Sequence, residues 1–207
     1  MVRQNDEIKT AHLGRADYET VWRAMQEFNV ARDATTADEL WLLEHPPVYT
    51  LGMAGDRAHL LYENGIPLLK TDRGGQITYH GPGQLVVYVL LDLNRRNLKV
   101  RELVRRMEQA VIDLLGNYAI EAARTPGAPG IYVAGAKIAA LGLRIKRGCS
   151  YHGLSLNVDM DLSPFAAINP CGYSGLAVTQ LRDLGVKQTL PAVADNLVQC
   201  LQESIGK

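Results

Sequence analysis

Apolar side chains recur at helical spacing in three segments of the chain. The first segment follows Asp17, whose carboxylate can cap a helix. The second begins at Val100 and has a stop signal at Gly116, and the third follows Thr189, with Pro191 in its first turn. The pattern therefore predicts one helix near each end of the chain and one in the middle.

Other segments have the pattern of strands. Residues 85–91 form a continuous apolar run, typical of a strand buried on both faces. Residues 138–145 and 152–159 alternate in part, and the basic residues and glycine between them favour a hairpin turn. These elements predict an α+β fold with a mixed or antiparallel sheet covered by helices. Because there is no repeat and no long linker, residues 1–207 are expected to form one domain.

Composition excludes several classes of protein. The 207 residues include 22 basic and 22 acidic side chains, so the chain lacks the surplus of positive charge typical of nucleic-acid-binding proteins. No apolar run approaches the roughly 18 residues of a membrane span, and the polar start resembles no secretory signal. The 3 cysteines are widely separated and form no disulfide framework. We therefore expect an intracellular globular protein that binds neither nucleic acid nor membranes.

Positive charge is nevertheless concentrated in one short region. Several basic side chains face a single acidic one, Glu102. Such a run is usually a solvated helix face, and the alternative is a docking patch for an acidic protein partner. The basic residues are Arg95, Arg96, Lys99, Arg101, Arg105 and Arg106.

The segment with the most unusual composition is residues 72–84, which lead directly into the predicted buried strand. Gly74 and Gly75 have no side chains, so a ligand can approach the backbone there, and Arg73 and His80 add polar groups. A tight turn explains the Gly-Pro-Gly that follows, but not this crowding of polar side chains beside a core strand. Because the Gly-Lys-Ser/Thr ending of a P-loop is missing, a nucleotide site is only weakly indicated.

The cysteines lie in different contexts. Cys200 falls on the apolar side of the third predicted helix, as a small core residue would, and Cys149 lies in the predicted hairpin turn, which offers no pocket. Cys171 lies in a loop rich in proline and glycine, just before a predicted helical segment at residues 176–184. The positive end of that helix would favour the thiolate, so Cys171 is a candidate nucleophile.

Lys137 is the only charged residue in a stretch of small and apolar residues, 135–142. One interpretation is a surface lysine on an edge strand. The other is a partly buried amine whose pKa is lowered and which shuttles protons. The 5 histidines show no zinc-ligand spacing with the cysteines, so no metal site is predicted. No serine lies in a Gly-x-Ser-x-Gly elbow, so no serine nucleophile of that kind is predicted.

Residues 73–88, RGGQITYHGPGQLVVY, resemble the signature of the octanoyltransferases of lipoate biosynthesis. Four further blocks resemble the same family in the expected order, at residues 45–52, 135–142, 152–158 and 170–172. Ordered blocks of this kind are far more specific than any single motif. The resemblance implies a cytoplasmic enzyme without a cofactor, on the α+β fold shared by biotin and lipoate protein ligases.

The resemblance also implies a reaction and its participants. An octanoyl group would pass from octanoyl-acyl carrier protein, through a thioester on Cys171, to a lysine of the lipoyl domains of 2-oxoacid dehydrogenases and of the glycine-cleavage H protein. Lys137 aligns with the lysine that lowers the pKa of this cysteine. It is also the leading acceptor for the proton of the substrate lysine, with His80 second. The residues that align with the family's substrate pocket are Arg73, Gly74, Gly75, Gln76, Ile77, Thr78, Tyr79, His80, Ala140, Leu141, Gly142, Gly153, Leu154 and Ser155.

The chemistry of these residues agrees with that reaction. Thioester exchange is nearly isoenergetic and amide formation is downhill, so no ATP is needed. Burial of about seven methylene or methyl groups at roughly 0.8 kcal/mol each contributes on the order of 5 to 6 kcal/mol, which favours an eight-carbon chain over much shorter ones. Because acyl carrier proteins are acidic, the cluster from Arg95 to Arg106 and the residues Arg144, Lys146 and Arg147 are candidate docking surfaces.

Two other functions stay open. An ATP-dependent lipoate or biotin protein ligase of the same fold would hold an acyl-adenylate beside Gly74 and Gly75, use Lys137 on its phosphate, and need no cysteine. A catalytically silent acyl-binding protein would form no covalent adduct. An octanoyl adduct on Cys171 would distinguish the transferase from both.

Overall fold

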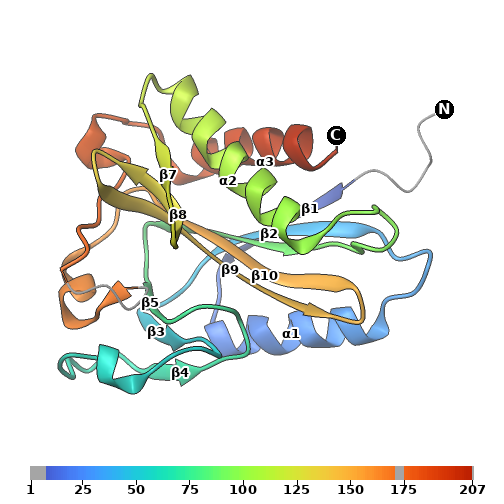
Figure 1. Ribbon diagram of the computed structural model, residues 1–207, viewed down its shortest axis with the longest axis horizontal. Coiled ribbons are helices and arrows are strands. Elements are labelled where there is room, and N and C mark those ends of the chain that lie inside the picture. Colours follow the sequence, from blue (N-terminus) through green and yellow to red (C-terminus); the bar gives the residue numbers. More distant parts are fainter. Residues whose placement is uncertain (1–7, 171–174, 207) are drawn as a thin grey trace.

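A seven-stranded mixed sheet forms the centre of the computed structural model, which describes residues 8–170 and 175–206 (Figure 1). The strand order is β1-β2-β6-β10-β9-β8-β7. β1 and β2 run parallel, and the other neighbouring strands of this sheet run antiparallel, so the predicted mixed sheet is confirmed. The strands are β1 (Ile8–Arg15), β2 (Asp38–Glu44), β6 (Gln84–Leu90), β7 (Ala123–Thr125), β8 (Ala128–Val133), β9 (Ala136–Lys146) and β10 (Cys149–Asn157).

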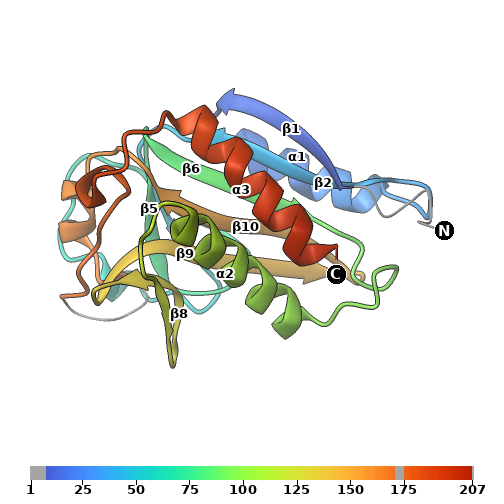
Figure 2. The ribbon, with the colours of Figure 1, turned by 90° about the horizontal axis from the view of Figure 1, so that it is seen from above.

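Helices cover both faces of this sheet. α2 (Val100–Asn117) and α3 (Leu190–Ile205) lie on one face, and α1 (Tyr18–Ala31) lies on the other (Figure 2). Asp17 accepts a hydrogen bond from the Thr20 amide at 2.9 Å, which gives α1 the predicted N-cap. All three predicted helices are thus confirmed. Among the described residues, no helix combines the length and the apolar character needed to cross a bilayer.

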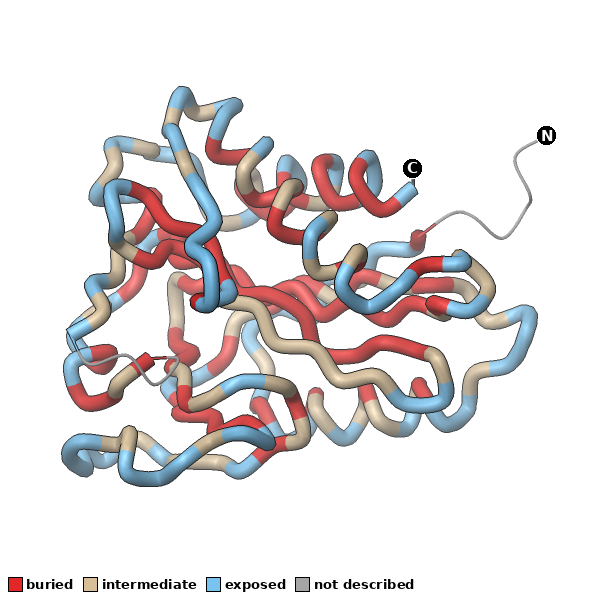
Figure 3. Tube along the Cα trace, in the orientation of Figure 1, coloured by how far each residue is buried: buried red, intermediate tan, exposed pale blue. Residues whose placement is uncertain are grey.

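β6 is buried at every position, as the continuous apolar run predicts (Figure 3). Its side chains alternate between two separate clusters. Val87 and Val89 pack with α2 and α3, whereas Val86 and Tyr88 pack with α1. A central strand with helices on both faces has no solvent-facing side, which explains why its sequence does not alternate.

β9 and β10 form the predicted hairpin. Its turn is Arg147-Gly148, and both residues have positive φ angles, 54° and 79°, as a two-residue turn of type I′ requires. Cys149 is therefore not at the tip of the turn. It begins β10, where burial raises the pKa of its thiol.

A second, three-stranded sheet, which the sequence patterns did not predict, lies beside the main one. It consists of β3 (Val48–Leu51) between β4 (Leu68–Lys70) and β5 (Ile77–His80), and its strands are only three or four residues long. Short 3-10 turns complete the fold: η1 (Arg57–His59), η2 (Ser163–Ala167) and η4 (Arg182–Leu184).

The prediction of a helix over residues 176–184 is wrong. The amide of Lys137 donates to the Ala177 carbonyl at 2.8 Å, and the Thr179 amide donates to the Lys137 carbonyl at 2.9 Å. The pairing of β9 with β10 begins only at Ala139, so the backbone of Lys137 has an open edge that this extended segment fills. The argument that a helix dipole acts on Cys171 therefore loses its helix, and Cys171 itself lies outside the described residues.

The basic cluster between Arg95 and Arg106 is not one docking surface. Arg95 and Arg96 contact the fully buried carboxylate of Asp38, together with Arg32 at 2.6 Å. Arg106 pairs with Glu102 and donates to the carbonyl of Ile205 near the end of α3. Of the six basic residues, Lys99, Arg101 and Arg105 are exposed.

We expect Asp38→Asn to lower the free energy of unfolding by about 3–5 kcal/mol, because three guanidinium groups would lose the one carboxylate that neutralises them in a buried place. Chemical denaturation measures this change. The matched control is Glu19→Gln, which breaks an exposed ion pair with Arg23 and should change stability by less than about 1 kcal/mol. Equal unfolding midpoints for Asp38→Asn and the unchanged protein would contradict the structural role of this cluster.

Candidate active site

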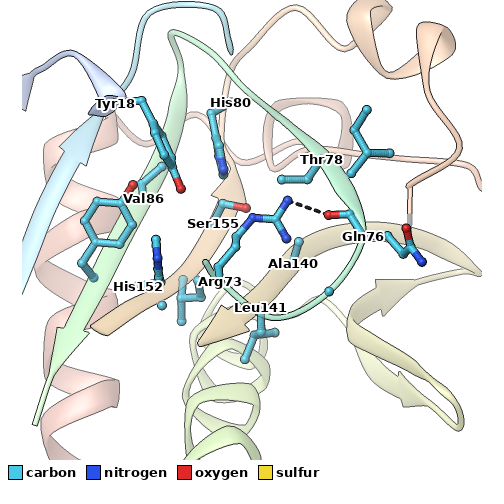
Figure 4. A pocket seen from close by; sticks show the side chains of 16 residues that line it. Tyr18, Arg73, Gln76, Thr78, His80, Val86, Ala140, Leu141, His152 and Ser155 are labelled. Atoms are coloured by element: carbon cyan, nitrogen blue, oxygen red, sulfur yellow. Dashed lines mark hydrogen bonds between the residues drawn. The ribbon is translucent and has the colours of Figure 1, made fainter. Parts of the chain in front are cut away.

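A pocket lies between β5, the segment before it, and the middle of the β9–β10 hairpin (Figure 4). Of the residues predicted to form a substrate pocket, all but Gly74 and Tyr79 line this cavity. Tyr79 lies on the opposite face of β5, where its ring packs against Tyr49 and Phe165. The pocket residues are Tyr18, Arg73, Gly75, Gln76, Ile77, Thr78, His80, Val86, Tyr88, Ala140, Leu141, Gly142, His152, Gly153, Leu154 and Ser155.

Four of these residues were missed in the sequence: Tyr18, Val86, Tyr88 and His152. His152 opens one of the blocks that carry the family resemblance, so a signal for it was present. Tyr18 had none, because it comes to the pocket from the start of α1, far away in the sequence.

The glycines of the pocket allow backbone segments to approach closely. The Gly74 amide donates to the Leu143 carbonyl at 2.9 Å, and a side chain at Gly142 would come within 3.0 Å of the Gly74 carbonyl. A side chain at Gly153 would collide with the Val87 carbonyl of β6. Gly74 and Gly142 therefore let the loop before β5 lie close to β9, and Gly153 lets β10 lie close to β6. The pocket forms between these segments.

Arg73 holds the loop in place. Its guanidinium is buried and donates to Thr50 Oγ1 at 3.0 and 2.9 Å, and to the carbonyls of Thr50, Gly74 and Gln76 at 2.6–2.8 Å. These charge-assisted hydrogen bonds from one guanidinium hold the loop before β5 against β3. The same guanidinium forms part of the pocket wall (Figure 4).

Asp72 orients His152. The Asp72 carboxylate accepts hydrogen bonds from His152 Nε2 at 2.9 Å, Trp22 Nε1 at 2.8 Å and the Tyr151 hydroxyl. Burial opposes ionisation of Asp72, but these three donors outweigh it and hold the pKa of the carboxyl well below its usual range. Burial lowers the pKa of His152, so its imidazole is neutral at pH 7. Because an ionised carboxylate can only accept, the His152 proton lies on Nε2, and Nδ1 is an unprotonated acceptor.

A chain of side-chain amides orients His80. Asn157 donates through Nδ2 to the Thr179 carbonyl, and Gln84 donates through Nε2 to Asn157 Oδ1, both at 2.9 Å. Gln84 Oε1 therefore accepts from His80 Nδ1 at 2.7 Å, and His80 Nε2 carries no proton. Burial, reinforced by nearby His45, lowers the pKa of His80 to about 3. His80 is thus neutral at pH 7 and a poor acceptor for a proton.

Lys137 is a buried amine, so the surface interpretation of this lysine is wrong. The residue is 4% exposed, and its Nζ donates to the Pro129 carbonyl at 3.0 Å and lies 5.2 Å from the centre of the Tyr132 ring. Gly130 makes room for it, because a Cβ there would come within 3.0 Å of Lys137 Cε.

A second cavity, lined in part by Lys137, adjoins the pocket. Lys137 and Pro170, the residue before Cys171, line it together. The second cavity shares Thr78, Ala140 and Ser155 with the first. The buried amine, the start of the Cys171 loop and the pocket are therefore adjacent. Among residues 8–170 and 175–206, no group of three histidine, cysteine or acidic side chains is placed to hold a metal ion.

Comparison with known proteins identifies the family. Residues 17–202 match the model of the lipoyl protein ligase A/B catalytic domain. The chain is 62% identical to an octanoyltransferase of Thiobacillus denitrificans, over 99% of this chain and 94% of the relative. It is 65% identical to an octanoyltransferase of an Azoarcus species, over 91% of this chain and 84% of the relative. The chain belongs to the octanoyltransferase group of the lipoyl protein ligase A/B family.

The fold of this octanoyltransferase-family chain is also that of distant ligases. A lipoate-protein ligase A with bound ATP superimposes with a TM-score of 0.80 at 17% identity, covering 96% of this chain and 85% of the ligase. The biotin protein ligase of Aquifex aeolicus gives a TM-score of 0.61 at 11% identity, covering 95% of this chain and 70% of the ligase. At these identities the likeness shows a common fold and leaves the reaction to be argued from the site.

The lowered pKa of His80 predicts a pH dependence of stability. A histidine that is neutral in the folded protein stabilises it fully above the unfolded pKa of about 6.5, and this stability is lost as the pH falls toward about 3. We therefore expect the melting temperature of His80→Gln to fall less between pH 7 and pH 4 than that of the unchanged protein. His12→Gln, at an exposed position of β1, is the control and should follow the unchanged protein. Parallel curves for all three proteins would contradict the assignment.

Proposed function

We propose that this protein transfers an octanoyl group from octanoyl-acyl carrier protein to the acceptor lysine of lipoyl domains, through a thioester on Cys171. The observation that carries the proposal is the buried amine of Lys137, in a cavity that Pro170 also lines and that adjoins the pocket. We place the reaction in the cytoplasm, where both protein substrates would be available.

In the first step, the thiolate of Cys171 attacks the carbonyl carbon of the carrier thioester. A new carbon–sulfur bond forms, and the carrier leaves as a thiolate that takes up a proton. The ammonium of Lys137 is the group proposed to favour the Cys171 thiolate and to supply that proton. Since residues 176–181 form no helix, we propose this role of Lys137 in place of the helix dipole as the cause of a lowered thiol pKa.

In the second step, the amine of the acceptor lysine attacks the octanoyl thioester. The carbon–sulfur bond breaks, an amide forms, and Cys171 leaves as a thiolate. Lys137, neutral after the first step, accepts the proton that the attacking amine loses. The low pKa of His80 argues against it in this role, because its conjugate acid would be too strong to hold the proton.

Three observations favour the pocket as the site of the acyl chain. Part of its wall consists of strand residues with small or apolar side chains: Ala140, Leu141, Gly142, Gly153 and Leu154. The pocket adjoins the cavity of Lys137, with which it shares Thr78, Ala140 and Ser155. The relatives with 62% and 65% identity carry the name octanoyltransferase, which favours an octanoyl group over lipoate or biotin.

Mass spectrometry after incubation with octanoyl-acyl carrier protein tests the proposal. We expect the unchanged protein to gain the mass of one octanoyl group on Cys171, and Cys171→Ala to gain none. Lys137→Ala should acquire the adduct about 100-fold more slowly. The Cys171 thiolate loses the ammonium that favours it, and the leaving carrier thiolate loses its proton donor.

Cys200→Ala is the matched control for this experiment. Cys200 is a buried residue of α3 whose pKa is raised by burial, so its loss should leave the adduct unchanged. An ATP-dependent ligase would instead modify lipoyl domains from free octanoate and ATP, and would tolerate Cys171→Ala. A protein that binds octanoyl groups without any adduct would be a silent binder. Either result would reject the transferase mechanism.

The exposed part of the basic cluster remains a candidate docking surface for the acidic carrier. We expect Arg105→Glu to raise the KM for octanoyl-acyl carrier protein several-fold at low salt, with a smaller effect at high salt. Arg23→Glu is the control, since it reverses one exposed charge on α1, across the sheet from α2 (Figure 1). An equal KM for both variants would exclude this surface.

A further inference from the structure

The end of the pocket away from Lys137 is polar. In Figure 4, Tyr18 and His152 lie on one side of the pocket, and Thr78 lies on the other, with Ser155 between them. Thr78 and Ser155 also line the cavity of Lys137, so they mark the end at which the proposed reaction takes place. A polar far end is unexpected in a pocket for an alkyl chain.

Two polar atoms at this end make no hydrogen bond of normal length, although the hydroxyl groups of Thr71 and Tyr88 lie near that of Tyr18. The Tyr18 hydroxyl and His152 Nδ1 are buried and make no hydrogen bond with the described part of the chain. Tyr18 is 2% exposed and His152 is 1% exposed. Polar atoms buried this deeply are hydrogen bonded in nearly all folded proteins, either to the protein or to ordered water. The two atoms are therefore available to bond to a small polar group at this end of the pocket.

The backbone of His152 is strained to place its ring there. Its φ angle is +60°, in the left-handed region, although the residue lies within strand β10. Ser150 supports this distortion, because its hydroxyl accepts from the Leu91 amide at 3.1 Å and donates to the Val89 carbonyl at 2.7 Å. Strain of this kind is typical of functional positions.

The length of the pocket matches an eight-carbon chain. Along β9, Ala140 pairs with Ser155 and Leu143 pairs with His152, so the two levels are three residues, or about 10 Å, apart. Seven carbon–carbon bonds in an extended chain span on the order of 9 Å. An octanoyl group whose carbonyl lies where the two cavities meet would thus end at the level of His152.

We propose that the Tyr18 hydroxyl and His152 Nδ1 form a polar stop that selects the terminus of the acyl chain. The proposal rests on the proposed function. An octanoyl group ends before the stop and leaves its polar partner in place. A longer alkyl chain displaces that partner and leaves both atoms without hydrogen bonds. A chain of the same length with a terminal hydroxyl bonds to them, so medium-chain acyl groups with a polar terminus are a further class of substrate.

Two donors of equal size test the proposal: nonanoyl-acyl carrier protein and 8-hydroxyoctanoyl-acyl carrier protein, which have the same number of non-hydrogen atoms. We expect the unchanged protein to have the higher kcat/KM for the hydroxylated donor. Tyr18→Phe keeps the shape of the pocket and removes one polar atom, so it should shift this ratio about 10-fold toward nonanoyl.

Tyr49→Phe is the control for loss of a buried tyrosine hydroxyl. Tyr49 donates to the Pro164 carbonyl and lies outside the pocket, so the ratio should stay that of the unchanged protein. A preference of the unchanged protein for nonanoyl, or an equal ratio in Tyr18→Phe, would overturn the polar stop. The comparison of the two donors needs no variant, so it holds even if Tyr18→Phe does not fold.

A binding measurement separates this proposal from the proposed reaction. Free 8-hydroxyoctanoate should raise the melting temperature of the unchanged protein more than nonanoate does, and Tyr18→Phe should reverse that order. If octanoyl is not transferred but this order holds, the reaction is wrong and the polar stop stands. If octanoyl transfer occurs and the order is absent, the reaction stands and the polar stop is wrong.

Discussion

The site depends on the hydrogen bonds that the backbone of Lys137 makes at the open edge of β9. Its amide and carbonyl bond to Ala177 and Thr179, at 2.8 and 2.9 Å. On its other edge, Lys137 is paired with Tyr132 of β8. A buried amine is tolerable only where its position and its polar partners are fixed, and this backbone is held from both sides. The chain that leaves the Cys171 loop is thus tied to the residue on which the proposed chemistry depends.

The two histidines of the pocket are held by different groups, and the same segment supports only His80. Thr179 also accepts from Asn157, which begins the amide chain that ends at His80. His152 instead depends on Asp72, which belongs to the loop that Arg73 fixes. Both imidazoles are neutral at pH 7 because burial disfavours their charged forms. The pocket is therefore polar without carrying charge on its histidines.

Local patterns predicted the helices and the hairpin, because these elements need only periodicity, caps and turn residues. The continuous run in β6 likewise identified a strand buried on both faces. The helix expected at residues 176–184 failed because a long-range contact decides that segment: the open edge of β9 pairs with it. The predicted docking surface is smaller than expected for a similar reason, because Arg95 and Arg96 form ion pairs with Asp38, which is distant in sequence. The pocket residues came from the family resemblance, and Tyr18 was missed because nothing near it in sequence marks a pocket.

The comparison with ligases shows why the fold alone does not decide the reaction. A lipoate-protein ligase A with bound ATP has the same fold at 17% identity. The fold is therefore compatible with two kinds of activated acyl group, an acyl-adenylate and a thioester. An acyl-adenylate draws its activation from ATP, whereas a thioester brings it with the carrier, and only the latter needs a nucleophile beside a proton donor. The buried amine of Lys137, which lines a cavity together with Pro170, is the group we propose as that proton donor. The proposed transferase therefore differs from a ligase of the same fold in the cysteine that would carry the acyl group and in the amine that would exchange protons with it.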